Sequence, residues 1–104
     1  MSSDREYYAV IFSTKRTPGD NGYEEMAERM MKLATKQPGF IGVDSARDDH
    51  LGITVSYWES QEAIADWKAN AEHLEAQKFG HKKWYQSTSL RVCKVIRESH
   101  FERG

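Results

Sequence analysis

Apolar residues recur along the chain with two different periods, and these periods predict its strands and helices. Four short runs rich in β-branched and aromatic residues, over 7–14, 40–49, 51–58 and 89–98, have the composition and length of β-strands. Two longer stretches instead place apolar residues every three or four positions, as one face of a helix requires. The predicted order is strand, helix, strand, strand, helix, strand.

The two predicted helices have recognisable boundaries. The first begins near Tyr23, carries acidic residues in its first turns and basic residues in its last, and stops at Pro38 and Gly39. The second has Ser60 as its N-cap. Its apolar stripe consists of Ile64, Trp67, Ala71 and Leu74.

This order of elements predicts an α+β, ferredoxin-like β-α-β-β-α-β fold with a four-stranded antiparallel sheet. Both helices are expected on one face of the sheet. Several strands are apolar on both sides, so the second face also needs a cover. The first strand places Tyr8, Val10 and Phe12 on one side, and Tyr7, Ala9 and Ile11 on the other. Since the chain offers no third helix, we expect a homodimer in which two sheets pack face to face as a dimeric α/β barrel.

Length and charge narrow the range of functions. A chain of 104 residues and 12.0 kDa suits one domain over 1–104, with a core from about 6 to 98 and a polar tail over 99–104. Its 15 basic and 16 acidic residues are interspersed, so the sequence lacks the basic footprint of a nucleic-acid-binding protein. No run approaches the roughly 20 apolar residues of a membrane span, and we expect a cytoplasmic protein.

Cofactor motifs are missing from the sequence. It contains no Gly-rich phosphate loop and no clustered cysteines, so we expect neither a nucleotide or flavin cofactor nor a bound metal. The single cysteine, Cys93, excludes an intramolecular disulfide, and its apolar surroundings in the sequence predict a buried thiol.

The candidate chemistry lies on the second helix. Asp66, Asn70, His73 and Gln77 form a polar strip beside the apolar stripe that contains Trp67. If this strip borders a pocket, Asn70 is suited to donate to a developing oxyanion and His73 to act as a base near neutral pH. The alternative is an ordinary solvated helix face, with Trp67 as a core residue.

Further aromatic residues are candidates for binding a ligand. Tyr8 and Phe12 share one face of the first strand, and we place Tyr57 of the third strand on the same cavity wall. His81 and Trp84 precede the last strand, where they either close over the pocket or form a packed contact in a dimer. A core role is equally consistent with the aromatic residues on the strands.

Three stretches carry a family resemblance: QPGFIGVDSAR, GITVSYWESQEAIADWKANAEH and TSLRVCKV. On these stretches, residues 6–98 resemble the antibiotic biosynthesis monooxygenase superfamily, small proteins with the dimeric α/β-barrel fold. Some members oxidise aromatic polyketides or quinols with O2 and without a metal or organic cofactor. The resemblance thus implies a cofactor-independent monooxygenase that acts on a small planar phenol or quinol.

Two other functions stay open at this point. One is a non-catalytic, dimeric small-molecule-binding or stress-related protein, because the fold does not fix the function. The other is the heme-degrading branch of the superfamily, which uses an Asn–Trp–His set. Trp67 matches its tryptophan, but Gln77 stands at the position of its histidine and residues 7–14 contain no asparagine. The heme function is therefore the least favoured.

Overall fold

The computed structural model describes residues 6–19, 22–77 and 84–104, with the backbone alone for 72–77. Its elements are β1 (Tyr7–Arg16), α1 (Tyr23–Thr35), β2 (Phe40–Arg47), β3 (Leu51–Trp58), α2 (Gln61–Gln77) and β4 (Tyr85–Val95). This confirms the predicted order of elements. The last strand begins at Tyr85 rather than Ser89 and ends at Val95 rather than Glu98.

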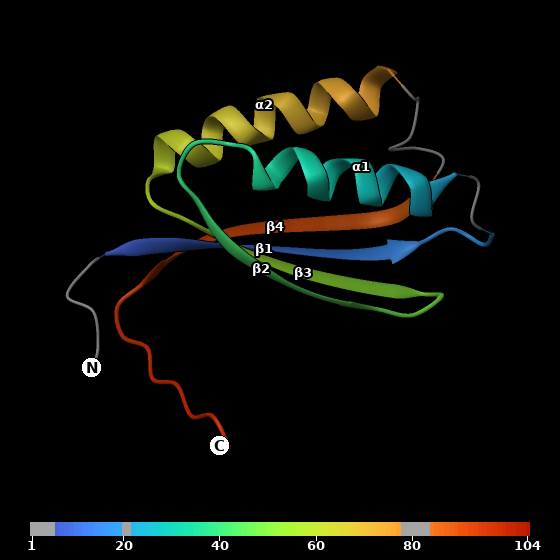
Figure 1. The fold of residues 1–104 in the computed structure, drawn as a ribbon. Coiled ribbons are helices and arrows are strands. Elements are labelled where there is room, and N and C mark those ends of the chain that lie inside the picture. The colour runs from blue at the N-terminus through green and yellow to red at the C-terminus, as the bar shows by residue number, and fades with distance from the viewer. Residues whose placement is uncertain (1–5, 20–21, 78–83) are drawn as a thin grey trace.

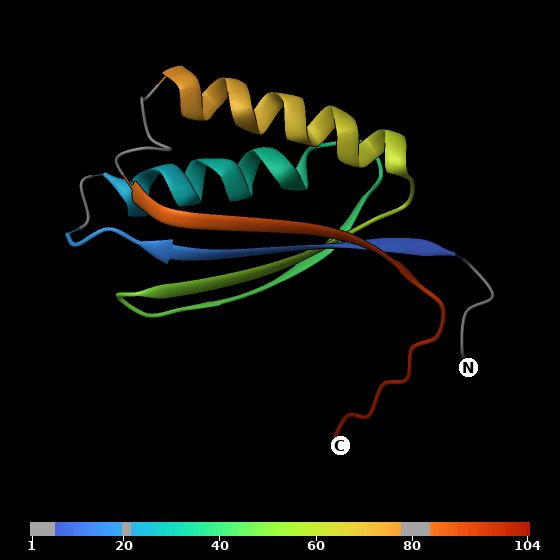
Figure 2. The ribbon, with the colours of Figure 1, turned by 180° about the vertical axis from the view of Figure 1, so that it is seen from behind.

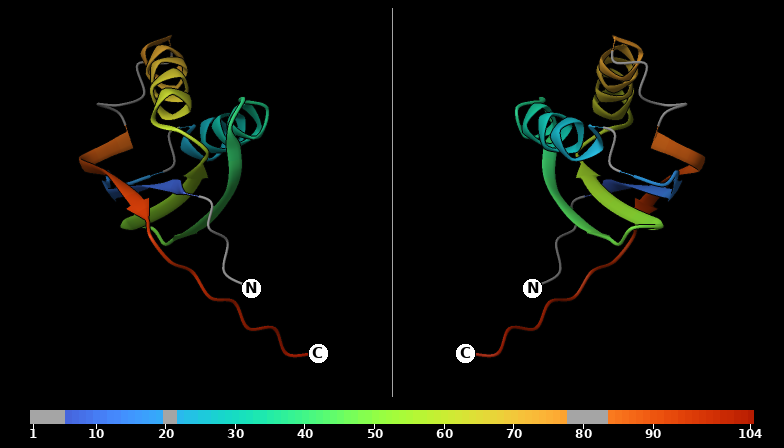
Figure 3. Two further views of the ribbon diagram at one scale, coloured as in Figure 1. Left: turned by 90° about the vertical axis from the view of Figure 1, so that its left-hand side faces the viewer. Right: turned by 90° about the vertical axis from the view of Figure 1, so that its right-hand side faces the viewer.

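The four strands form one antiparallel sheet in the order β2-β3-β1-β4. Both helices cover the same face of this sheet, so the domain has two layers (Figure 1). The view from behind and the two end-on views show the same arrangement (Figures 2 and 3). The ferredoxin-like α+β fold predicted from the sequence is thus confirmed.

Asp48 closes the hairpin between β2 and β3. Its Oδ1 accepts hydrogen bonds from the backbone N–H groups of His50 and Leu51, both at 2.8 Å. These bonds stabilise the ionised carboxylate and lower the pKa of Asp48 below its ordinary value. The turn therefore begins at Asp48, and β2 ends at Arg47 rather than at position 49.

The core between helices and sheet consists of two groups of buried residues. The first contains Val10, Ala34, Trp58 and Ile64, and the second contains Tyr23, Met26 and Trp84. Trp58 is fully buried, with Phe40 packed edge-on at a centroid distance of 5.4 Å. The alternation of β1 and β3 and the helical period of α1 and α2 bring these residues together.

The opposite, helix-free face of the sheet is also largely apolar. Because Ala9 pairs with Tyr57 and Cys93, and Ile11 pairs with Val55, these five residues share that face. Leu51 and Ile53 continue it, and they are 45% and 42% exposed. The prediction of a buried Cys93 thiol is wrong for the single chain, because none of the described elements covers its strand on this side. Among the described residues, no helix is long and apolar enough to cross a membrane.

Gly39 makes the connection from α1 to β2 possible. Its φ of 85° lies in the left-handed region, which disfavours residues with a side chain. A Cβ at this position would lie 2.7 Å from the Cβ of Ala63 on α2. The backbone therefore passes close to α2, and only a glycine fits there.

We expect Gly39→Ala to lower the free energy of unfolding by about 3 kcal/mol, from left-handed strain together with overpacking against Ala63. Gly22→Ala is the matched control, because Gly22 has the same φ of 85° and open space around a Cβ. It should cost only about 1 kcal/mol. Urea unfolding of both variants measures the difference, and equal losses would show that the contact with Ala63 is unimportant.

Candidate functional site

A cavity of about 550 Å³ lies between the two helices and the sheet. Both helices and all four strands contribute to its wall. Most lining side chains are apolar or aromatic, including Phe12, Tyr23, Met30, Met31, Trp67 and Leu90. A cavity of this size and lining is typical of a site for a small, mainly apolar ligand.

Polar groups enter the cavity from β2 and β3. Ser45, Thr54 and Ser56 line it because alternate residues of each strand face the helices. The hydroxyl groups of Ser45 and Thr54 are hydrogen bonded to each other at 3.0 Å. Ser56 Oγ accepts a hydrogen bond from Trp58 Nε1 at 2.9 Å. These strands thus supply a small number of fixed hydroxyl groups to an otherwise apolar space.

Trp67 belongs both to the core and to the cavity. Its ring is half-buried and stacks on Trp58, with centroids 6.1 Å apart and planes inclined by 22°. It also lines the cavity beside Lys68, one turn after Ile64 and one turn before Ala71. Trp67 is therefore a packed residue whose remaining free surface forms part of the cavity wall.

Asn70 is not among the residues that line the cavity. Asn70 is exposed, and its Nδ2 donates to Gln37 Oε1 at 3.3 Å, which links α2 to the end of α1. Successive helical positions differ by about 100°, so position 73 lies about 200° around α2 from the cavity-lining Ala71. The side chain of His73 is outside the described residues. The catalytic roles of both residues stay predictions.

The aromatic residues of the strands were expected to share one cavity wall, but they do not. Phe12 lines the cavity, and Tyr8 packs nearby against the buried group around Trp58. The placement of Tyr57 on that wall is wrong. Tyr57 pairs with Ala9 and therefore lies on the helix-free face. There its ring packs edge-on against Tyr7, with the ring centroids 6.2 Å apart.

Tyr57 is instead part of a polar contact on the helix-free face. Its hydroxyl donates to Asp44 Oδ2 at 3.0 Å. Partial burial, together with this hydrogen bond to the carboxylate, raises the pKa of Tyr57 above its ordinary value. The phenol therefore stays protonated through the neutral range, and it takes no part in the cavity.

Trp84 supports the cavity wall from outside. It is buried and packs edge-on against Tyr23, at a centroid distance of 6.0 Å, and Tyr23 in turn lines the cavity. His81, predicted beside it, lies outside the described residues. Within the described part of the chain, no group of three or more His, Cys, Asp or Glu residues is arranged to hold a metal ion.

Several lining residues were not singled out from the sequence, notably Tyr23, Met30, Met31 and Arg47. Met30 and Met31 lie one turn after Ala27 on α1, so the helical period does place them on the cavity side. Arg47 is in phase with Val43 and Ser45 on β2, so the alternation of that strand does place it on the helix side. The alternation of β2 indicated this position of Arg47 only weakly, because a charged residue at a strand end is normally solvated.

Comparison with known proteins agrees with this architecture. The family model described as antibiotic biosynthesis monooxygenase matches residues 7–78. The chain is 52% identical over 99 residues to the uncharacterized protein YqjZ of Bacillus subtilis (strain 168). This alignment covers 94% of this chain and 87% of YqjZ.

Several solved structures resemble this chain in fold. SnoaB, a cofactor-independent oxygenase from Streptomyces nogalater, matches with a TM-score of 0.64 at 14% identity, over 95% of this chain and 99% of that chain. PA3566 from Pseudomonas aeruginosa matches with a TM-score of 0.70 at 17% identity, over 93% and 99%.

Proposed function

Because the chain belongs to the antibiotic biosynthesis monooxygenase family, we propose that it is a cofactor-independent monooxygenase acting on a small planar phenol or quinol. The observation that carries this proposal is the cavity of about 550 Å³ with its aromatic and methionine-rich wall. The similarity in fold to a cofactor-independent oxygenase adds support.

The lining of the cavity favours a flat aromatic ligand. Trp67 and Phe12 offer ring faces and edges, which attract other aromatic rings in stacked or edge-on geometry. Met30 and Met31 add polarisable thioethers that adapt to the outline of a ring. The strand hydroxyls, Ser45, Thr54 and Ser56, lie along one side, where they are suited to meet phenolic oxygens.

The proposed reaction requires no external reductant. An ionised quinol passes an electron to O2, and recombination of the resulting radical pair forms a carbon–oxygen bond to the ring. Loss of water then leaves a hydroxylated quinone. One oxygen atom enters the product and the other leaves as water, and the quinol supplies all the electrons. The protein has to bind the quinol, favour its ionisation and limit the access of water.

The proposed reaction also needs a base and a donor to the developing oxyanion. We propose His73 as the base, acting through a bridging water, since imidazole titrates near neutral pH and position 73 is not on the cavity side of α2. Asn70 is the proposed donor to the developing anion. To act in this way, its amide must leave Gln37 Oε1 and turn toward the ligand.

A non-catalytic binding role is the second candidate. Its support is that the described residues lining the cavity include neither histidine nor cysteine. This candidate predicts that aromatic ligands raise the melting temperature without being consumed. Heme binding stays the least favoured alternative. We expect a heme titration to produce no shift of the Soret band.

Filling the cavity tests the proposed activity. We expect Ala71→Phe to lower kcat/KM for quinol-dependent oxygen uptake by at least about ten-fold, because Ala71 lines the cavity and a phenyl ring there takes ligand space. Ala65→Phe is the matched control on the exposed side of α2 and should leave the rate unchanged. His73→Ala in the same assay should lower kcat and remove the pH dependence that a histidine base imposes. Oxygen uptake that is absent with every quinol, or insensitive to Ala71→Phe, contradicts the proposal.

We further propose that two copies pack through the helix-free face, as the family resemblance implies. This face combines residues from β1, β3 and β4, among them Ile11, Val55 and Cys93. Together with the exposed Leu51 and Ile53 it forms a contiguous apolar surface, which monomeric proteins seldom leave in water. Its coverage by an identical sheet would also bury the Cys93 thiol.

Sedimentation tests the dimer. We expect twice the 12.0 kDa chain mass, and we expect Ile53→Arg to dissociate the dimer by placing a charge on the helix-free face. Val92→Arg is the control, because Val92 is similarly exposed but pairs with Val10 on the helix side. The Cys93 thiol should react with a disulfide reagent faster in the Ile53→Arg protein. A 12.0 kDa species in the unaltered protein would overturn the dimer.

A further inference from the structure

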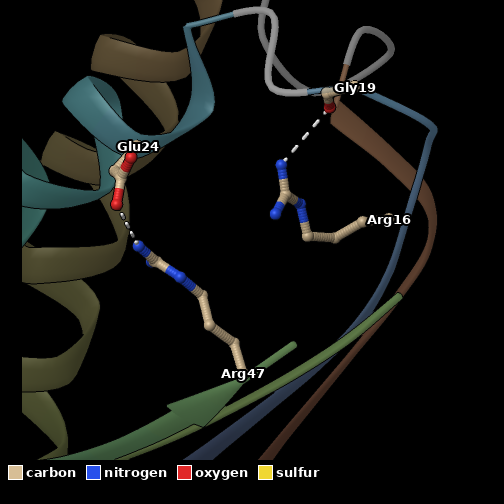
Figure 4. A network of polar contacts seen from close by, with 4 residues as sticks. All are labelled: Arg16, Gly19, Glu24 and Arg47. Atoms are coloured by element: carbon tan, nitrogen blue, oxygen red, sulfur yellow. Dashed lines mark hydrogen bonds and ion pairs between the residues drawn. The ribbon is translucent and has the colours of Figure 1, made fainter. Parts of the chain in front are cut away.

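One end of the cavity carries two arginines that the proposed reaction does not use. Arg47 is the last residue of β2, and Arg16 is the last residue of β1. Both guanidinium groups extend into the space between the sheet and the start of α1 (Figure 4). Arg47 lines the cavity itself, and Tyr23, which lies beside both arginines, lines it as well.

The two guanidinium groups converge on the same aromatic ring. The Cζ of Arg16 lies 3.8 Å from the centroid of Tyr23, and the Cζ of Arg47 lies 5.2 Å from it. Tyr23 is buried, so its ring is held in place by the core. Cation–π contact orients each planar group and offsets part of the repulsion between the two positive charges.

The hydrogen-bonding capacity of these arginines is largely unused within the described part of the chain. Arg47 Nη2 lies 3.6 Å from Glu24 Oε1, on a carboxylate whose side chain is 69% exposed. Arg16 Nη2 donates to the backbone oxygen of Gly19 at 3.5 Å, and its buried Nε has no partner. A guanidinium offers five N–H donors, and a long, exposed ion pair contributes little to stability. Among the described residues, the ion pair between Arg47 and Glu24 is therefore long and exposed to water.

A further polar group, the side chain of Thr14, lies level with Arg47 across the strands of the sheet. Thr14 is 4% exposed, and its Oγ1 is buried without a hydrogen-bond partner among the described residues. It pairs with Gly52 on one side and Thr88 on the other, and Gly52 pairs with Arg47. The end of the cavity near the β2–β3 hairpin thus carries polar and positively charged groups. The rest of its wall is mainly apolar, with Glu28 and Lys68 as its other charged residues.

We propose that Arg47, assisted by Arg16, binds the carboxylate of a planar aromatic acid whose ring occupies the cavity. A guanidinium presents parallel N–H donors that match the two oxygens of a carboxylate. Arg16 adds positive potential and fixes the ring of Tyr23 against which Arg47 lies. The inference rests on the proposed binding of an aromatic ring in the cavity, but it does not depend on turnover.

A pair of probes of equal shape tests the charge requirement in the full-length protein. We expect 2-naphthoate to bind at least about ten-fold more tightly than the neutral 2-naphthamide, measured by calorimetry or tryptophan fluorescence. Arg47→Gln should remove this preference and leave the affinity for the amide unchanged. Arg16→Gln should reduce the preference in part. Because Arg47 is exposed, its substitution should preserve the fold, which circular dichroism checks.

Arg91→Gln is the matched control, since it removes the same charge from the helix-free face, where Arg91 pairs with Ile11. It should keep the preference for the acid. Equal binding of the two probes, no binding of either, or a preference that survives Arg47→Gln would overturn the inference. Quinol-dependent oxygen uptake is measured separately, so failure of the charge requirement is distinguishable from failure of the proposed reaction.

Discussion

The packing of Trp58 is the contact on which the rest of the structure depends. This side chain is fully buried at the end of β3, where Phe40 packs against its edge and Trp67 stacks on its face. One residue thereby connects the start of β2, the end of β3 and the middle of α2. Its indole N–H is satisfied within the same strand by Ser56, so the burial leaves no unpaired donor.

This anchor sets the geometry of the cavity. Trp58 lies at one end of β3, and Gly52, which pairs with Arg47, lies at the other. The strand rises by about 3.3 Å per residue, so about 20 Å separates the aromatic anchor from the arginines. Thr54 and Ser56 face the cavity between them. A ligand that spans part of this distance meets aromatic rings toward one end and positive charge toward the other.

Local sequence pattern was sufficient for the fold and insufficient for the site. Periodicity predicted both helices and the order of elements along the chain, because each element needs its own apolar face. The same alternation misplaced Tyr57: when both faces of a strand are apolar, only the pairing of Tyr57 with Ala9 decides which face meets the helices. Arg47 and Arg16 were missed for a related reason, since they meet only through Tyr23, and that contact depends on how α1 lies over the sheet.

The central claim, that a planar aromatic molecule occupies the cavity, has a direct spectroscopic test. Met30 and Met31 line the cavity, whereas Met26 is buried in the neighbouring group with Tyr23 and Trp84. In protein labelled with 13C at the methionine methyl groups, titration with 2-naphthoate should move the Met30 and Met31 resonances by ring current and leave Met26 nearly unchanged. Unchanged Met30 and Met31 signals at a saturating ligand concentration would contradict the account.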